Sequence, residues 1–444
     1  MRRVLFALTA AALAVSALSV PASAAGTVRM VDDDGRASPG RCNGNGSAFK
    51  TVQKAIDASR RDDTVLVCPG TYREGVFIQG DKDGLTLRST RPWKARLVRV
   101  AANPAAPTAP IVHIREGADR VTVQHLALTW RTTRLAPAGN VGCRGLALVW
   151  SQGRDAAIRA NRMRVTGDTL GKCSVENGIL VGGGIYASGR APVASALVAH
   201  NLVRDFASAG ITASGDSRVE ILRNSVRYWH LDAAERRLGA AAAGRASLQR
   251  QVRRATSPSG INAEAFGIAA FGAGRPVISG NEVSSGPDAE PLRRVAGGPA
   301  FSPRLSLGIA VFGIRGADIM DNTVRRTEAG IVLVDTTESR VLRNVTEDHG
   351  YGIYLVGASS SNVVRGNQAS TGFQGIVVDD QPIAGDGDGA VDNRFVRNTS
   401  LYHWYIDCLD ETGPAPQGGD FGTDNIWREN VGLTAEPAGI CEAD

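Results

Sequence analysis

The chain has 444 residues and a formal net charge of +6; 43% of its residues are hydrophobic, 5% are aromatic and 52 are glycine. This hydrophobic content excludes a wholly disordered chain. Abundant glycine and few aromatic residues indicate many tight turns around an aliphatic core, which is not the composition of a helix bundle. Arginines are spread along the chain among acidic residues, so nucleic-acid binding is not expected.

Residues 1–24 have the features of a secretory signal peptide. Arginines at positions 2 and 3 precede an uncharged apolar run, and an A-x-A cleavage site ends at Ala24. The run is shorter than a membrane span needs to be. We therefore expect a secreted mature chain, residues 25–444, without a membrane segment. General secretion is favoured over twin-arginine export, because no fuller twin-arginine motif surrounds the arginine pair.

All six cysteines follow the cleavage site. An even number of cysteines in an oxidising compartment predicts disulfide bonds, and the lack of a CxxC motif argues against a zinc site. Pairing the cysteines with their neighbours in the sequence gives the bonds Cys42–Cys68, Cys143–Cys173 and Cys408–Cys441.

Residues 47–60 are predicted to form a helix. Ser47 can act as its N-cap, and Phe49, Val52 and Ile56 form an apolar stripe at helical spacing. A solenoid has an open core at its end, and such a helix can cover it.

A repeat of short strands organises the rest of the chain. A Gly-Ile pair recurs at residues 210, 267, 308, 330, 352 and 375. A second recurring element ends in an asparagine, at residues 161, 201, 224, 281, 322, 344, 367, 398 and 430. One unit holds three short strands and cannot bury its apolar side alone. We therefore expect stacked units, with strands about 4.8 Å apart and the asparagines joined in a hydrogen-bonded ladder.

This repeat resembles the right-handed parallel β-helix of the pectin-lyase-like superfamily, over residues 45–435. The resemblance implies an all-β solenoid with three strands per coil, formed by residues 25–444 as a single domain. It implies that the asparagines lie in the turn between the second and third strands. It also implies that the Gly-Ile strands form the first sheet, whose face commonly carries a substrate groove. The motifs of pectin methylesterases, polygalacturonases and pectate lyases are absent or incomplete, and methylesterase activity is not expected.

Two insertions interrupt the repeat. Residues 229–262 have a helical pattern of alanine and leucine, which suits a surface helix, a lid over a groove or a helix on a membrane surface. Residues 286–305 contain four prolines and are predicted to form a loop.

Three aspartates are candidates for acid–base catalysis. Asp335 and Asp380 each follow their strand glycine by five residues, and Asp379 directly precedes Asp380. Because Asp335 and Asp380 lie two coils apart, their carboxylates can approach the spacing of an inverting glycosidase pair. The alternative is that these aspartates only serve tight turns.

A second cluster surrounds His349, the candidate proton carrier. Arg326, Glu328, Asp348 and His403 fall at neighbouring positions of the repeat. Such a patch can bind a uronate through the arginine and move protons through the histidine. The alternative is a solvent-facing ladder of ion pairs.

A glycine-rich loop carries Asp386, Asp388 and Asp392. Clustered carboxylates on a loop suit calcium, which makes Ca²⁺ the candidate cofactor. The alternative is a solvated acidic loop.

These features predict a secreted, monomeric β-helix protein that acts on or binds extracellular polysaccharide, and the mildly basic chain is compatible with an acidic one. As an enzyme it would be a polysaccharide lyase or a glycoside hydrolase. The alternative is a non-catalytic surface or glycan-binding scaffold, since a fold does not determine an activity.

Overall fold

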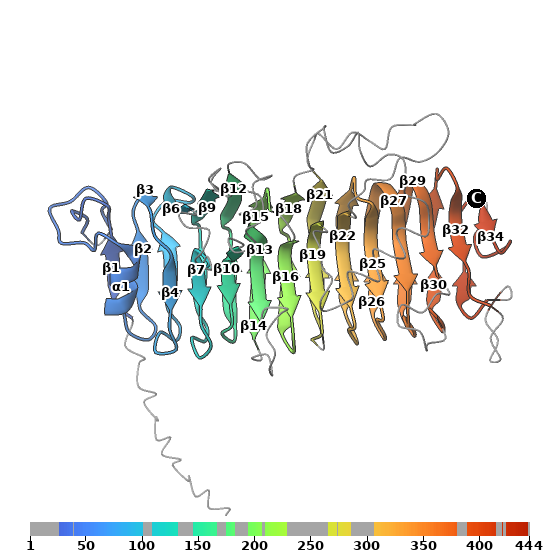
Figure 1. Ribbon diagram of the computed structural model, residues 1–444, viewed down its shortest axis with the longest axis horizontal. Helices are drawn as coiled ribbons and strands as arrows, with labels where there is room; N and C mark the ends of the chain where they lie inside the picture. Colours follow the sequence, from blue (N-terminus) through green and yellow to red (C-terminus); the bar gives the residue numbers. More distant parts are fainter. Residues whose placement is uncertain are drawn as a thin grey trace, which may run out of the picture.

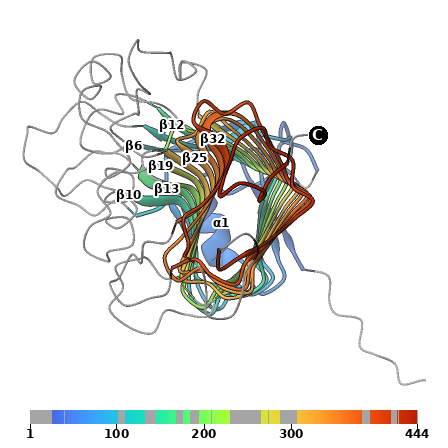
Figure 2. The ribbon, with the colours of Figure 1, turned by 90° about the vertical axis from the view of Figure 1, so that its right-hand side faces the viewer.

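A computed structural model describes residues 26–38, 40–100, 109–131, 145–166, 175–182, 194–206, 209–228, 265–272, 274–285, 306–379, 389–413, 420 and 423–442. The predicted signal peptide and both predicted insertions lie outside these residues, as do Cys143, Cys173, Asp380, Asp386 and Asp388. The described chain winds as a right-handed parallel β-helix, as predicted, with three faces around one core (Figures 1 and 2).

The first sheet contains the Gly-Ile strands. Its strands in order are β4 (Val76–Ile78), β7 (Val112–Ile114), β10 (Gly145–Ser151), β13 (Val175–Gly182), β16 (Ala209–Ser214), β19 (Ala265–Phe271), β22 (Ser306–Phe312), β25 (Ala329–Val334), the second halves of β27 (Val345–Val356) and β29 (Gln368–Val378), β32 (Ile406–Asp410) and β34 (Ala435–Glu436).

The second sheet follows the first in each coil. Its strands are β1 (Val28–Val31), β2 (Thr64–Val67), β5 (Thr86–Ser89), β8 (Thr122–Gln124), β11 (Ala156–Arg159), β14 (Ser195–Ala199), β17 (Arg218–Leu222), β20 (Val277–Ser279), β23 (Asp318–Met320), β26 (Arg340–Leu342), β28 (Val363–Arg365), β30 (Arg394–Val396) and β33 (Ile426–Arg428).

The third sheet follows the asparagine turn. Its strands are β3 (Gly70–Tyr72), β6 (Ala95–Val100), β9 (Ala127–Arg131), β12 (Arg162–Thr166), β15 (Leu202–Arg204), β18 (Ser225–Tyr228), β21 (Glu282–Ser285), β24 (Thr323–Arg325), the first halves of β27 and β29, and β31 (Thr399–Leu401). Strands β27 and β29 run without a break around the corner from the third sheet into the first.

The glycines of the Gly-Ile strands stack one above another, as predicted. Ile309 pairs with Ile331, which pairs with Ile353 in the next coil. A Cβ on Gly330 would lie 2.5 Å from the carbonyl oxygen of Gly352, so this column has no room for a larger residue. The isoleucines point into the core, which holds aliphatic side chains from all three sheets.

The predicted asparagine ladder is present in the turn between the second and third sheets. Within it, Asn322 donates from its backbone N–H and its Nδ2 to Oδ1 of Asn344, at 3.0 and 2.9 Å. Asn344 donates in the same way to Asn367 and also bonds the carbonyl of Ile319 at 2.9 Å. The buried ladder runs through Asn161, Asn201, Asn224, Asn281, Asn322, Asn344, Asn367, Asn398 and Asn430.

A shorter ladder in the turn between the first and second sheets was not predicted. Asn362 donates to Asn393, and Asn393 donates to Asn425, each through its backbone N–H and its Nδ2. The sequence motif before the second-sheet strands is less regular than the Gly-Ile motif, so the asparagines of this ladder are harder to recognise in the sequence.

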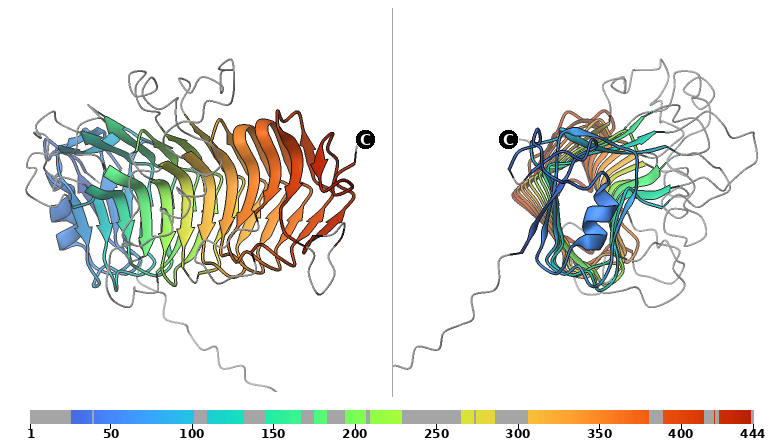
Figure 3. Two further views of the ribbon diagram at one scale, coloured as in Figure 1. Left: turned by 45° about the vertical axis from the view of Figure 1, so that its right-hand side comes forward. Right: turned by 90° about the vertical axis from the view of Figure 1, so that its left-hand side faces the viewer.

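Helix α1 (Val52–Ala58) lies at the N-terminal end of the coil (Figure 3). Its N-cap is Thr51 rather than the predicted Ser47, because Thr51 has an extended backbone and its hydroxyl accepts a hydrogen bond from the N–H of Lys54. Glu74 also accepts bonds from two N–H groups of the first turn. Val52 and Ile56 are buried against the core, as expected for a cap.

Two predicted disulfides, Cys42–Cys68 and Cys408–Cys441, are formed. Cys408 occupies the core column of the Gly-Ile isoleucines, in register with Ile376, so the second bond ties the C-terminal segment to the last coils. No helix among the described residues is long and apolar enough to cross a membrane.

Replacement of Asn344 by alanine tests the ladder. The change leaves two buried donors of Asn322 and the carbonyl of Ile319 without their partner. We expect Asn344→Ala to lower the free energy of unfolding by about 3 kcal/mol, measured by denaturant titration. The control is Asn45→Ala, at an exposed asparagine. Equal stabilities of the two variants would contradict a structural role for the ladder.

Candidate functional site

The predicted catalytic aspartates occupy different environments. Asp335 lies in a turn at φ 48°, and its Oδ1 accepts a hydrogen bond of 2.9 Å from the N–H of Ala358. Asp379 is buried after strand β29 and accepts a hydrogen bond of 2.6 Å from the hydroxyl of Tyr354. Asp335 therefore has the geometry expected of a turn residue. Asp380 lies outside the described residues, so the proposed pair of carboxylates stays a prediction.

The structure brings His349 and His403 into ring contact. Their ring centroids are 5.3 Å apart, with 25° between the planes, although the two residues belong to different coils. The intervening coil has Gly372 in register with His349, and a Cβ there would lie 2.3 Å from Nδ1 of His349. The missing side chain of Gly372 therefore leaves the space in which the two imidazoles meet.

His349 lies inside the molecule rather than on a surface patch. It is fully buried, and neither ring nitrogen has a hydrogen-bond partner among the described residues. Burial, with a smaller effect of the neighbouring His403, lowers the pKa of His349 to about 3. The corner of β27 turns this side chain inward, which does not fit the alternative of a solvent-facing ion-pair ladder at this position. The role of His349 as a proton carrier stays a prediction.

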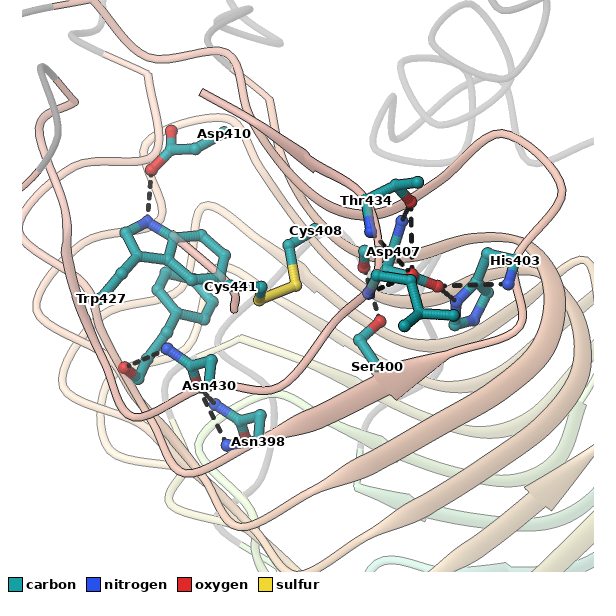
Figure 4. The surroundings of a disulfide bond; sticks show 12 residues. Asn398, Ser400, His403, Asp407, Cys408, Asp410, Trp427, Asn430, Thr434 and Cys441 are labelled. Atoms are coloured by element: carbon teal, nitrogen blue, oxygen red, sulfur yellow. Dashed lines mark hydrogen bonds and ion pairs between the residues drawn. A yellow bond between two sulfur atoms is a disulfide. The ribbon is translucent and has the colours of Figure 1, made fainter. Parts of the chain in front are cut away.

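Asp407 holds His403 in place (Figure 4). Its Oδ1 lies 2.7 Å from Nδ1 of His403, and its Oδ2 accepts bonds from the N–H groups of Leu433 and Thr434 at 2.8 and 3.1 Å. Burial lowers the pKa of His403, and the contact with Asp407 opposes that shift. The sequence did not reveal Asp407, which becomes visible only when the end of the chain folds back on β32.

The other members of the predicted patch are divided between the inside and the outside of the corner. Glu328 is buried, whereas Asp348 is exposed. Arg326 and Asp348 have positive φ angles of 57° and 53°, so each occupies a bend at the end of its third-sheet strand. The predicted patch is therefore divided between the interior and the surface of this corner, and its role in binding a uronate stays a prediction.

The outer face of the first sheet also differs from the expected substrate groove. Along strands β19 to β29 most of its outward side chains are apolar and buried, and the rings of Phe271 and Phe312 stack 4.7 Å apart. This cluster comprises Ala209, Phe266, Ala269, Leu307, Ala310, Phe312, Ala329, Val332, Val334, Tyr351, Tyr354, Val356, Val377, Ile406 and Leu409. Such a face is not an open polar groove.

An exposed aromatic patch, here defined as Tyr402, Trp404 and Tyr405, was missed by sequence reasoning. These side chains are 67%, 52% and 54% exposed, whereas His403 between them points inward. Tyr405 also stacks on Phe373 at 5.4 Å. The signal was available as three large aromatic residues within four positions of an aromatic-poor chain, but the repeat pattern assigns no role to them.

The backbone of the aromatic patch is fixed on the neighbouring coil. The N–H groups of Trp404 and Tyr405 donate to the carbonyls of Gly372 and Phe373, both at 3.0 Å. The inward bond between His403 and Asp407 adds a third anchor. The patch is therefore a preorganised surface at the corner between the third and first sheets.

The predicted calcium loop stays a prediction. Asp386 and Asp388 lie outside the described residues, and Asp392 is an exposed turn residue at φ 56°. Within the described ranges, no group of three or more histidine, cysteine, aspartate or glutamate side chains is arranged to hold a metal ion.

The buried histidines predict a loss of stability in acid. Their folded pKa values lie below the value of about 6.5 of an unfolded imidazole. The unfolded chain therefore takes up protons at these positions as the pH falls below about 6.5, while the folded chain does not, so stability decreases. His349→Phe removes one such group, and we expect it to reduce the stability lost between pH 7 and pH 5 by about 2 kcal/mol, measured by denaturant titration.

The matched control is His200→Asn, at an exposed histidine with a positive φ angle that asparagine tolerates. It should leave the pH dependence of stability unchanged. A wild-type pH profile retained by His349→Phe would contradict the assignment.

The comparisons with known proteins concern the fold. A family model described as a right handed beta helix region matches residues 166–369. No curated protein matches the sequence. The solved structure of XylC in complex with xylose is similar with 10% identity and a TM-score of 0.53, and the match covers 91% of this chain and 83% of that one.

Two further solved structures are similar at lower scores. A PL6 family polysaccharide lyase from Pseudopedobacter saltans has 12% identity and a TM-score of 0.44, with coverage of 88% and 93%. The catalytic unit of a GH87 alpha-1,3-glucanase from Streptomyces thermodiastaticus has 13% identity and a TM-score of 0.43, with coverage of 92% and 69%. Together with the stacked coils and the asparagine ladder, the family match and the XylC structure show that this chain has the right-handed parallel β-helix fold.

Proposed function

We propose that this protein is exported and binds polysaccharide through the aromatic patch of Tyr402, Trp404 and Tyr405. The observation that carries the proposal is the exposure of three adjacent large aromatic side chains on a rigid corner. Aromatic rings offer a large, flat, apolar surface at a small cost in conformational entropy, and this surface suits the apolar faces of sugar rings.

Export is supported by the features of residues 1–24 and by the two disulfides at the ends of the solenoid. An exported protein encounters the polysaccharides that lie outside the cell. The long, straight stack of coils provides a surface on which several sugar units can lie at once (Figure 1). The XylC structure with this fold contains xylose, which makes xylan a sensible first probe.

Alanine at Trp404 tests the patch. Trp404→Ala removes the central ring, and we expect it to weaken binding to xylan, a β-glucan or polygalacturonate about tenfold, equivalent to about 1.4 kcal/mol. Affinity electrophoresis in gels containing each polymer measures the change. Val28→Ala, which trims an exposed apolar side chain of the second sheet, is the control. Identical mobilities of Trp404→Ala and wild type in every gel would refute the assignment.

A second candidate function, a polysaccharide lyase or glycoside hydrolase, is favoured by the pair of Asp379 and Tyr354. The carboxylate and the phenol are both buried and are joined by a hydrogen bond of 2.6 Å. Both side chains lie on the outward side of the first sheet. A lyase needs a base that removes the proton next to a uronate carboxyl group and an acid that protonates the leaving oxygen. Asp379 and Tyr354 are groups of these two types.

Asparagine at position 379 separates the two candidates. For an enzyme, Asp379→Asn should lower the appearance of unsaturated products or reducing ends at least a hundredfold, because it removes the base without changing side-chain size. Asp155→Asn, at an exposed turn aspartate with a φ of 55°, should leave the rate unchanged. If the wild-type protein binds the polymers without turnover, the proposed binding function stands and the proposed enzymatic activity is excluded.

A further inference from the structure

Three arginines lie directly above one another on the outer face of the third sheet. Arg164 of β12 pairs in register with Arg204 of β15, which pairs with Arg227 of β18. Their neighbours Met163, Val203 and Val226 point into the core, so the alternation of the strands places the arginines outward. We call these three residues the arginine column.

Elsewhere in the solenoid, arginines face acidic side chains of an adjacent coil. Arg343, for example, makes a two-pronged contact with Asp321 at 2.8 Å. The other pairs of this kind are Arg154–Asp119, Arg315–Glu338, Arg325–Glu347, Arg340–Asp318 and Arg397–Glu429. Opposite charges one coil apart are therefore a recurring arrangement among the described residues.

The arginine column instead places like charges one coil apart. Arg164 bonds Asp205 at 2.7 Å, but neither Arg204 nor Arg227 has a carboxylate partner in the described part of the chain. The Nε atom of Arg204 is buried and has no hydrogen-bond partner among the described residues. Like charges directly opposite each other on neighbouring strands are destabilising, and the three strands that carry these arginines lie about 4.8 Å apart.

We infer that the third sheet binds an acidic polysaccharide, with the arginine column as its contact for carboxylates. An anionic polymer lying along the coil axis would offset the repulsion between the guanidinium groups and supply the missing partners. The inference rests on the proposed polysaccharide-binding function. It makes that function more specific by naming the class of polysaccharide. The aromatic patch directly follows β31 of the same sheet.

A polysaccharide is a better occupant than a nucleic acid. The column is three arginines long, and acidic side chains pair with several other arginines of the described surface, which interrupts a continuous basic stripe there. The exposed rings of the aromatic patch supply stacking surfaces for sugars at the other end of the sheet. Repeating carboxylates on a sugar chain match arginines that repeat once per coil.

The experiment compares Arg204→Gln/Arg227→Gln with the control Arg340→Gln/Arg343→Gln in the purified protein. Both double variants lose two positive charges, but the control residues are paired with Asp318 and Asp321. Isothermal titration with polygalacturonate, xylan and single-stranded DNA is performed over a range of salt concentrations. Thermal unfolding confirms that both variants are folded.

We expect Arg204→Gln/Arg227→Gln to bind polygalacturonate about tenfold more weakly, with a slope of log affinity against log salt reduced by roughly 1.4, and to bind xylan like wild type. The control should change the polygalacturonate affinity less than twofold. Equal effects of the two double variants would overturn the arginine column as the contact, and DNA bound more tightly than polygalacturonate would overturn the polysaccharide as its ligand.

The two proposals fail in different ways. Polygalacturonate binding that depends on Trp404 but not on Arg204 and Arg227 would leave the proposed function intact and refute the inference. A wild-type protein that binds no polysaccharide would refute the proposed function and the inference together.

Discussion

No coil of this protein can bury its apolar side chains unless another coil lies against it. Each coil holds short strands that expose one row of isoleucine, valine or leucine to the interior, and the neighbouring coils close the core above and below. The asparagine ladder sets the alignment, because each side chain bonds the backbone of the coil before it and the asparagine after it. A residue in the wrong register would leave buried amide groups without partners.

This constraint also determines where chemistry can occur. Because register positions stack, a glycine in one coil opens space between side chains of the coils on either side, as Gly372 does for His349 and His403. Identical residues at one position of successive coils form columns. The asparagines form such a column in the interior, and Arg164, Arg204 and Arg227 form one on the outside. The exposed corner at Tyr402, Trp404 and Tyr405 is rigid for the same reason, since its backbone bonds the coil beneath.

The fold was largely predictable from the sequence, because strand period, glycine and asparagine positions are local signals that repeat. The alignment of Gly308, Gly330, Gly352 and Gly375 follows from that pattern. Two of the disulfides follow from pairing each cysteine with its neighbour in the sequence. The site was much less predictable. A repeat reveals a residue's position along a coil, but not which way a side chain turns at a corner, and His349 turns inward for that reason. Asp407 depends on a distant C-terminal segment, and the aromatic patch interrupts the repeat instead of following it.

We propose a protein that holds a polymer rather than one built around the predicted catalytic cluster. The predicted acids and histidines are divided among a turn, the core and the outer face, whereas the aromatic patch and the arginine column share the third sheet. In this account the stacked coils present similar contacts at regular intervals to a polymer whose units also repeat.

Hydroxyl-radical footprinting with and without a bound polysaccharide tests this account most directly, because it reports which exposed side chains a ligand covers. The account predicts that Tyr402, Trp404 and Tyr405 become protected while Val28 of the second sheet keeps its reactivity. Protection confined to the second sheet, or full reactivity of all three aromatic side chains in the complex, would contradict it.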